Sequence, residues 1–498
     1  MKKLLTLGAA ILCLQGYAQT KSLSDPTFVP DSSTKWDLQR CIIYARQNNI
    51  PVKQTAIQAA SADLQLRQAR LNQYPNLTLS TGLGVQFGLS IDRTTNVYSN
   101  TQAIYQNIGV SSGIVVYNWG RLKNSVAVSQ FNAEAALADV DRAGNDLGLN
   151  VATYYLQVLA NKEQIAINEL QASQTQAQIN ITGKQVEAGA LPELNLVELQ
   201  AQLATDSSNI IAARSAYEQS ILSLKGLLSL DAAAPFELLT PAVESIPVPS
   251  LAEMQPEDVY QIALHTQPLQ RGDSLRIRSS QKNTEVYKSM MYPTLSFGVN
   301  LATNFYNPFQ QITGASFAGY SPVTGAESIV NVGGTNYFVQ SPVFKFTQST
   351  RSFGQLFDGY TNQLANNFGQ GVGFNLSVPI FNNGQNRINY EQSKLTYKNT
   401  LLQKKQDDLT LKLNIYTAYS NAVSALQKFN AGIKSVQSNQ QAYDFALKRY
   451  NVGLLSTIDL LTNQNNLLRA KLQQVANQFD YVFKMKVLEY YKNSSLVL

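Results

Sequence analysis

The chain has 498 residues, and charged residues make up only 14% of it, against roughly 25% in typical soluble domains. Apolar residues make up 44%, which excludes a disordered chain, because disorder requires few apolar residues and high charge. The single histidine, His265, and the two cysteines, Cys13 and Cys41, nearly exclude a Ser–His–Asp centre and a multi-histidine metal site. We therefore expect no enzyme, no metal site and no cofactor. The net charge is +6, but the sequence contains no run of five like charges, which argues against nucleic acid as a partner.

The N-terminal 18 residues have the pattern of a secretory signal peptide. Lys2 and Lys3 precede an apolar stretch, residues 4–14, and the small residues Gly16 and Ala18 occupy the two positions that signal peptidase reads. We expect cleavage after Ala18. No later segment contains 18 consecutive apolar residues, so the sequence predicts no transmembrane helix in the rest of the chain.

Two short motifs occur twice, which indicates an internal duplication. Residues 74–77 (YPNL) recur as residues 292–295 (YPTL), at an offset of 292 − 74 = 218 residues. Residues 117–120 (YNWG) recur as residues 381–384 (FNNG), at an offset of 381 − 117 = 264 residues. The second copy therefore carries 264 − 218 = 46 extra residues between the two motifs.

The duplication divides the mature chain into two structural repeats, residues 19–230 and 257–498. Residues 231–256 form a proline-rich linker between them. Each repeat should contain a helix, a β-hairpin and a long helical hairpin. The two β-hairpins are expected at about 76–117 and 294–381.

Both β-hairpins alternate apolar residues with small polar residues. Period-two alternation places the apolar side chains on one face of a strand, while the other face carries Gly, Ser, Thr and Asn almost without charge. This pattern is typical of a transmembrane β-barrel; the alternative is a half-buried sheet in a secreted soluble protein. Four strands cannot close a barrel alone, so several chains must share one, two chains giving eight strands and three giving twelve. The apolar positions of the first strand are Leu77, Leu79, Leu83, Val85, Phe87, Leu89 and Ile91.

Aromatic residues mark the strand ends that join helices. They are Tyr74, Tyr117, Trp119, Tyr292 and Phe381. Because these ends share one edge of the sheet, we expect an aromatic girdle at one membrane interface. The 46 extra residues should form a long extracellular loop, roughly residues 304–366, since the outer connections of such barrels are usually the long ones.

Two proline-free segments predict very long helical hairpins. Residues 121–188 and 385–452 each read as one helix of about 100 Å, and the chain should turn back near Gly189 and Gly453. The second helix carries a large apolar stripe with coiled-coil spacing and a second stripe of alanines, which would let it contact neighbours on both sides. The large stripe is Leu409, Leu413, Tyr416, Tyr419, Val423, Leu426, Phe429 and Ile433, and the alanines are Ala418, Ala422 and Ala425.

Residues 378–384 (VPIFNNG) and 449–461 (RYNVGLLSTIDLL), together with the duplicated layout, resemble the TolC family of outer-membrane efflux proteins. The resemblance implies a mixed α and β membrane protein. In such a protein a homotrimer forms a 12-stranded transmembrane β-barrel in the lipid of the cell outer membrane, continuous with an α-helical coiled-coil barrel in the periplasm. It implies a passive exit duct for small molecules, served by a periplasmic adaptor (membrane fusion protein) and an inner-membrane transporter. The alternative within the family is the channel of a type I protein secretion system.

The resemblance also assigns roles to residues at the two hairpin turns. The adaptor-docking tip would comprise Gly189, Ala190, Leu191, Val452, Gly453, Leu454, Leu455 and Ser456. Tyr450 and Asp459 match residues that constrict the periplasmic end in relatives. Leu455 stands where those relatives have an arginine, and Thr462 replaces a second aspartate, so closure is expected to be more apolar here. Tyr450 could instead be a coiled-coil core residue, and Asp459 could serve only the first turn of its helix.

A function of a different class is a periplasmic structural or nucleic-acid-binding coiled coil. Only the isoelectric point of about 9.0 favours it. It explains neither the signal peptide nor the alternating strands, so the channel is the main hypothesis.

Overall fold

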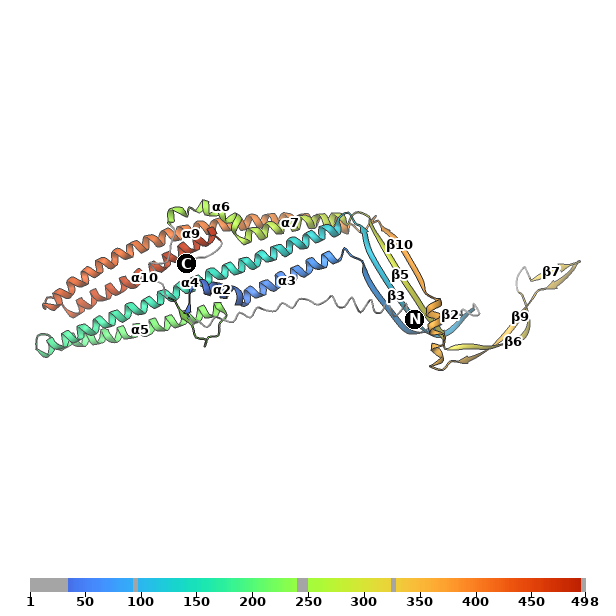
Figure 1. Ribbon diagram of the computed structural model, residues 1–498, viewed down its shortest axis with the longest axis horizontal. Coiled ribbons are helices and arrows are strands. Elements are labelled where there is room, and N and C mark those ends of the chain that lie inside the picture. The colour runs from blue at the N-terminus through green and yellow to red at the C-terminus, as the bar shows by residue number, and fades with distance from the viewer. Residues whose placement is uncertain (1–34, 93–96, 240–249, 324–327, 494–498) are drawn as a thin grey trace.

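The computed structural model describes residues 35–92, 97–239, 250–323 and 328–493. The predicted signal peptide, residues 1–18, and residues 240–249 of the predicted linker lie outside these ranges. Figure 1 shows an elongated molecule in which long helices run from one end to a sheet, and a narrow β-ribbon projects beyond the sheet. The predicted mixture of long helices and strands is confirmed. We call the end with the two helical turns the tip end, and the opposite end the ribbon end.

Two long helical hairpins form most of the body. The first pairs α4 (Arg121–Glu187) with α5 (Glu193–Leu228), and the second pairs α9 (Gln385–Asn451) with α10 (Thr457–Asn493). The helices α4 and α9 each have 67 residues, which corresponds to about 100 Å. Neither contains a proline, which would remove a helical hydrogen bond and bend the axis. Within the described residues no helix is both long enough and apolar enough to cross a membrane.

Shorter helices lie beside the long ones. They are α2 (Leu38–Asn48), α3 (Ile50–Leu71), α6 (Pro256–Thr266) and α7 (Pro268–Ser289). Helix α3 packs on α4, and α7 packs on both α4 and α9. The linker was expected to extend through residue 256, but α6 begins at Pro256, because proline has no N–H to lose in the first helical turn. The linker also contributes the single turn η3 (Leu251–Glu253).

The largest apolar core surrounds α2, between the two hairpins. The short strands β1 (Lys35–Trp36) and β4 (Glu237–Leu238) pair in parallel there and tie the linker to the N-terminal segment. Tyr155 and Leu228 are buried in this core, and Tyr155 donates a hydrogen bond to the Leu239 carbonyl at 2.5 Å. Cys41 is fully buried, and burial raises the pKa of its thiol to about 12, so it carries no reactive thiolate at neutral pH.

The two stripes of α9 differ in burial. The alanine stripe (Ala418, Ala422 and Ala425) is buried within the chain, together with Leu411 and Ile415. Much of the large apolar stripe remains exposed: Leu409 is 56% exposed and Leu413 67%. Small side chains let α9 approach α10 closely. Of the large stripe, Phe429 stacks on Tyr481 of α10, whereas Leu409 and Leu413 lie on the outer side of the helix.

Four antiparallel strands form the main sheet, in the order β10-β5-β3-β2. They are β2 (Asn76–Asp92), β3 (Val97–Tyr117), β5 (Thr294–Pro308) and β10 (Gly369–Ser377). The second β-hairpin was expected to end at about residue 381, but β10 ends at Ser377, two residues before Pro379, which cannot donate to a ladder. One face of the sheet carries exposed apolar side chains, for example Phe87 at 69% and Val372 at 74%.

The inserted segment is structured, where the sequence predicted a long loop. Strands β6 (Gln310–Pro322) and β9 (Gln340–Thr350) form the ribbon, and β7 (Ile329–Val332) pairs with β8 (Thr335–Phe338). The segments η4 (Gln355–Phe357) and α8 (Tyr360–Asn366) then pack on the apolar face of β3 and β5. Phe305 is fully buried beneath them, beside Ile104 and Leu356. We call η4 and α8 the outer cap.

Candidate functional site

The two hairpin turns have the same backbone geometry. Gly189 and Gly453 adopt φ angles of 71° and 76°, in the left-handed region that favours glycine. At the first turn Ala190 N donates to Gln185 O at 2.8 Å, and at the second Leu454 N donates to Arg449 O at 2.9 Å. Both are six-residue helix-terminating bonds of the Schellman type. A side chain at either glycine would meet nothing within 4 Å, so both turns are open to a partner.

The tips of the two hairpins touch through an apolar cluster. Tyr450 and Leu460 are buried in it, and Leu191 and Leu455 pack against them. The Tyr450 hydroxyl lies 3.1 Å from Thr182 Oγ1, which joins α9 directly to α4. Tyr450 therefore occupies the core between the hairpins, and the structure brings it together with two residues of the predicted docking tip.

A buried polar network continues this contact away from the tip. Asp206 is 1% exposed and accepts hydrogen bonds from Thr175 Oγ1 at 2.6 Å and Gln202 Nε2 at 2.8 Å. Gln464 Nε2 of the second hairpin donates to the same Thr175 oxygen at 3.1 Å. The buried Nε2 atom of Gln171 has no partner in the described structure, which costs about 1–3 kcal/mol. Behind the apolar cluster at the tip, the hairpins are thus held together by partly satisfied polar contacts.

The sequence analysis did not single out these polar residues, because glutamine and threonine are usually exposed. The signal was their spacing on α4: Gln171, Thr175, Gln178 and Thr182 are all buried, at intervals of 4, 3 and 4 residues. Intervals of this kind mark the packing face of a helix, whatever the polarity of its residues.

Asp459 lies at the start of α10 and is exposed. Its backbone N donates to Ser456 Oγ at 3.1 Å, and Ser456 Oγ donates to Asp459 Oδ2 at 2.7 Å. These contacts cap the helix, and the carboxylate favours the positive end of the helix dipole. A single chain shows the capping role; the lumen of a constriction would need several chains.

The predicted girdle residues gather where the helices meet the sheet. The rings of Tyr117 and Trp119 are 5.4 Å apart, and those of Trp119 and Tyr292 are 5.0 Å apart. Tyr74 and Phe381 are 68% and 81% exposed at the outer strands. Aromatic side chains at this position suit a membrane interface.

The turns that precede the long helices α4 and α9, next to the girdle, have the same backbone conformation. Trp119 and Asn383 both have positive φ, 55° and 54°, and each precedes a glycine with positive φ, Gly120 or Gly384. Arg121 N donates to Asn118 O, and Gln385 N donates to Asn382 O, both at 3.0 Å. The duplicated YNWG and FNNG motifs are therefore two copies of one strand-to-helix corner.

The model of the family described as "Outer membrane efflux protein" matches residues 42–229 and 341–483, which cover more than half of the chain. The chain belongs to this family. It resembles TolC, as the sequence motifs indicated, and is an outer-membrane protein.

Curated relatives and solved structures agree with this assignment. The pyoverdine export outer membrane protein OpmQ of Pseudomonas putida is 21% identical over 373 residues. The match covers 72% of this chain and 64% of that protein, which is less than two thirds of its length. Outer membrane protein TolC of Escherichia coli is 20% identical over 442 residues, covering 88% and 78%. The structure of CusC, described as forming a transmembrane channel, superposes with a TM-score of 0.69 at 16% identity over 92% of this chain and 91% of that one. That likeness shows the fold.

Proposed function

We propose that three copies of the chain form the outer-membrane exit duct of a tripartite efflux pump. The duct is passive and carries small molecules driven out by an inner-membrane transporter through a periplasmic adaptor. The observation that carries this proposal is a pair of complementary, exposed apolar flanks on the described part of one chain. The name of OpmQ, which refers to pyoverdine export, supports a small-molecule cargo.

Exposed heptad stripes run along both flanks of the helical body. On α3 the stripe is Ile50, Ile57, Leu64 and Leu71, which are 57–69% exposed. On α9 it is Ile388, Leu395, Leu402, Leu409 and Tyr416, which are 42–65% exposed. Figure 1 shows α3 and α9 on opposite sides of the body. Seven-residue spacing is typical of coiled-coil seams, so α3 of one copy fits α9 of the next.

The sheet continues the same two flanks. Its edge strands are β2, which follows α3, and β10, which precedes α9. A head-to-tail contact that joins β10 to the next copy's β2 repeats around an axis and can close a ring. Three copies would give twelve strands and leave no open edge.

The apolar face of the sheet matches the height of a membrane. On β3 the apolar positions run from Ile108 to Val116, between the girdle and the outer cap. Nine residues extend about 30 Å along a strand, and a tilt of about 40° reduces this to about 23 Å. The apolar band of outer-membrane barrels is about 25 Å tall.

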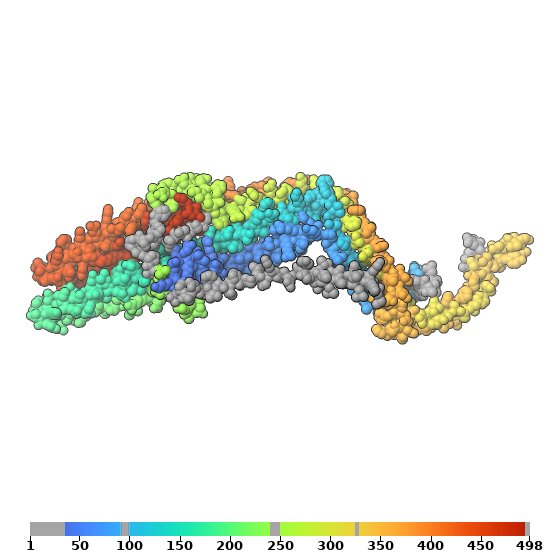
Figure 2. All heavy atoms as spheres, viewed as in Figure 1, coloured from blue at the N-terminus to red at the C-terminus, as the bar shows by residue number. Residues whose placement is uncertain are grey.

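The tip end suits the adaptor. Leu454 and Val452 are each 68% exposed beside Gly453, outside the apolar cluster that joins the two tips. Figure 2 shows the two hairpin tips together at one end of the molecule. We propose that the predicted tip residues dock the adaptor's helices, and that the three copies of Asp459 narrow the duct beside them.

Cysteine cross-linking tests the ring. The variant Leu64→Cys/Leu395→Cys places thiols at the same level of the two flanks, two heptad layers from the sheet. Oxidation in outer membranes should give dimers and trimers joined by disulfides and no larger species. The buried Cys41 should not interfere. In the matched control Leu64→Cys/Leu402→Cys the thiols are offset by about 10 Å and should not react. Equal cross-linking of both pairs, or a ladder that stops at the dimer, would refute the ring.

A further inference from the structure

The four strands of the sheet are almost free of charge. Across β2, β3, β5 and β10 the one charged residue is Asp92, at the outer end of β2. The face opposite the apolar band carries glycine, serine, threonine, asparagine and tyrosine. If the sheet closes as proposed above, this face lines the lumen of the barrel.

Strand register aligns residues of this face in rows. Asn107 pairs with Gly82 on one side and Asn304 on the other. Two residues further out, Tyr105 pairs with Gly84 and Tyr306. Residues directly opposite in antiparallel strands share a face, so an amide row lies beside a tyrosine row. The asparagines and tyrosines of the two rows come from β3 and β5, which lie far apart in the sequence.

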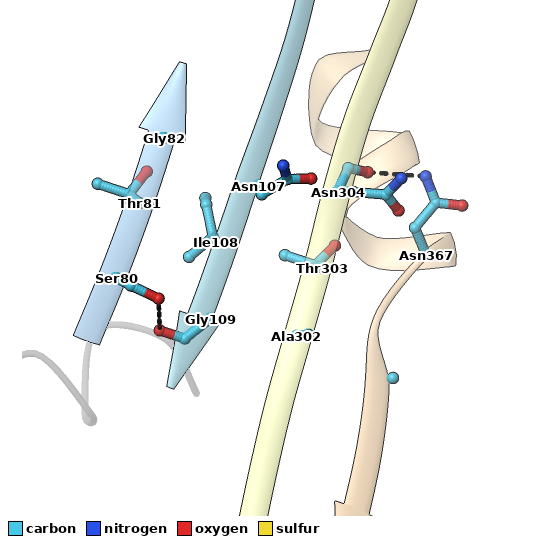
Figure 3. Close-up of a pocket in the computed structure, with 11 residues that line it drawn as sticks. Ser80, Thr81, Gly82, Asn107, Ile108, Gly109, Ala302, Thr303, Asn304 and Asn367 are labelled. Carbon is cyan, nitrogen blue, oxygen red and sulfur yellow. Dashed lines mark hydrogen bonds between the residues drawn. The ribbon is translucent and has the colours of Figure 1, made fainter. Parts of the chain in front are cut away.

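A hollow of about 600 Å³ lies at the amide row. Figure 3 shows Asn107, Asn304 and Asn367 pointing to one side of the strands, away from Thr81 and Ile108. Asn367, at the end of α8, donates through Nδ2 to Asn304 O at 2.7 Å, which fixes its position beside the row. Small residues open the space: Gly82, Gly109 and Gly369 all line the hollow.

The amide groups are available for a ligand. Within the described residues the side-chain amides of Asn107 and Asn304 make no hydrogen bond with the protein. Tyr105 lies over Gly84 so closely that a Cβ at this glycine would be 2.8 Å from the ring. The glycine therefore lets the tyrosine ring lie flat against the wall, next to the amide row.

We propose that this hollow binds neutral, hydroxyl-rich solutes during export, with oligosaccharides as the model class. The proposal rests on the exit-duct function, because the hollow faces a lumen only in a closed barrel. A carboxamide offers two N–H donors and a carbonyl acceptor, which match hydroxyl groups that both donate and accept. A tyrosine offers an apolar ring face and a polar tip beside them.

The absence of charge argues against ions as the ligands of the hollow. Charge-selective pores use rings of charged side chains, which compensate an ion for lost hydration. The strand residues around this hollow supply no charge of either sign. A neutral polyol loses only hydrogen bonds to water on entry, and the amide row can replace them.

Single-channel recording in planar bilayers tests the proposal with maltohexaose added from the ribbon side. The wild-type channel should show resolved blocks by maltohexaose that last longer than blocks by polyethylene glycol of matched hydrodynamic radius. The polymer fills the same volume without the hydroxyl groups. In Asn107→Leu the residence time of maltohexaose should fall by about 2- to 10-fold, as expected for one lost hydrogen bond. Block by polyethylene glycol should not change.

Asn375→Leu is the matched control. Asn375 lies on the same face of β10, opposite Ser296, and outside the hollow. It should conduct like wild type and keep the long blocks. Equal residence times for the sugar and the polymer, or equal losses in both variants, would overturn the binding site while the channel itself conducts. Outer-membrane protein that gives no conductance at all would instead refute the exit duct.

Discussion

We expect the hydrogen bond between Tyr450 and Thr182 to stabilise the closed state of the tip end. It is the direct side-chain hydrogen bond between the two hairpins closest to the turns, and both residues are buried. Tyr450→Phe removes the hydroxyl and keeps the ring in its apolar cluster. Thr182 Oγ1 retains a long contact with Gln178 Nε2 at 3.5 Å, so no polar atom is left fully unpaired.

The expected cost follows from the geometry. One lost neutral hydrogen bond destabilises the hairpin contact by about 0.5–1.5 kcal/mol per chain. If the three tips of a trimer separate together, the total is about 1.5–4.5 kcal/mol. The open-to-closed ratio then rises by roughly 10- to 2,000-fold, because 1.4 kcal/mol corresponds to a factor of ten.

Conductance of single channels in planar bilayers measures this ratio. Tyr450→Phe should raise the open fraction, and Thr182→Val should raise it equally. The double variant should add little, since both changes remove one bond. Tyr443→Phe is the control: Tyr443 packs on the same cluster, and in the described structure its hydroxyl makes no hydrogen bond. If Tyr443→Phe and Tyr450→Phe open the channel equally, or neither does, the bond does not hold the tips.

Three further changes test other parts of the structure. Asp459→Asn should weaken block by multivalent cations from the periplasmic side, and unchanged block and ion selectivity in bilayers would leave Asp459 a capping role alone. Leu454→Asp should abolish efflux, measured as drug susceptibility, while trimers still form; full efflux would contradict docking at this turn. Asp273→Asn should raise the unfolding temperature at neutral pH, because burial and the nearby Asp407 raise the pKa of the Asp273 carboxyl. Because the pKa of Asp273 is higher in the folded protein than in the unfolded one, wild-type stability falls as the pH rises above the unfolded pKa of about 4. The gain in unfolding temperature from Asp273→Asn should therefore disappear below about pH 4. A gain that does not depend on pH would contradict this cause.

The hairpin turns and strand-to-helix corners could be predicted from local sequence. Gly453 and Gly384 stand where the backbone needs positive φ, and that requirement is visible in one sequence. The lengths of α4 and α9 follow from the absence of proline over 67 residues. The structure of the inserted segment was harder to predict. Its glycines and aromatics suggested a loop, but β6 and β9 form backbone hydrogen bonds with each other along a ribbon.

The role of Tyr450 shows where local pattern stops being informative. Its motif suggested a constriction or a core position, and only the contact between the two hairpins shows that it bonds to Thr182, 268 residues away. The polar face of α4 was missed for the same reason. A buried glutamine differs from an exposed one only through the neighbour that covers it.

The sequence by itself determined the period of each element, and thereby which side chains share a face. Alternation in β2 and seven-residue spacing on α3 depend only on backbone geometry, which is the same in any fold. The tertiary structure decided which faces meet. On α9 the chain buries the alanine stripe and leaves much of the large stripe exposed, because close helix packing favours small side chains. The row of Asn107 and Asn304 exists only through the register of β3 with β5, since a shift of one residue would turn each amide to the opposite face.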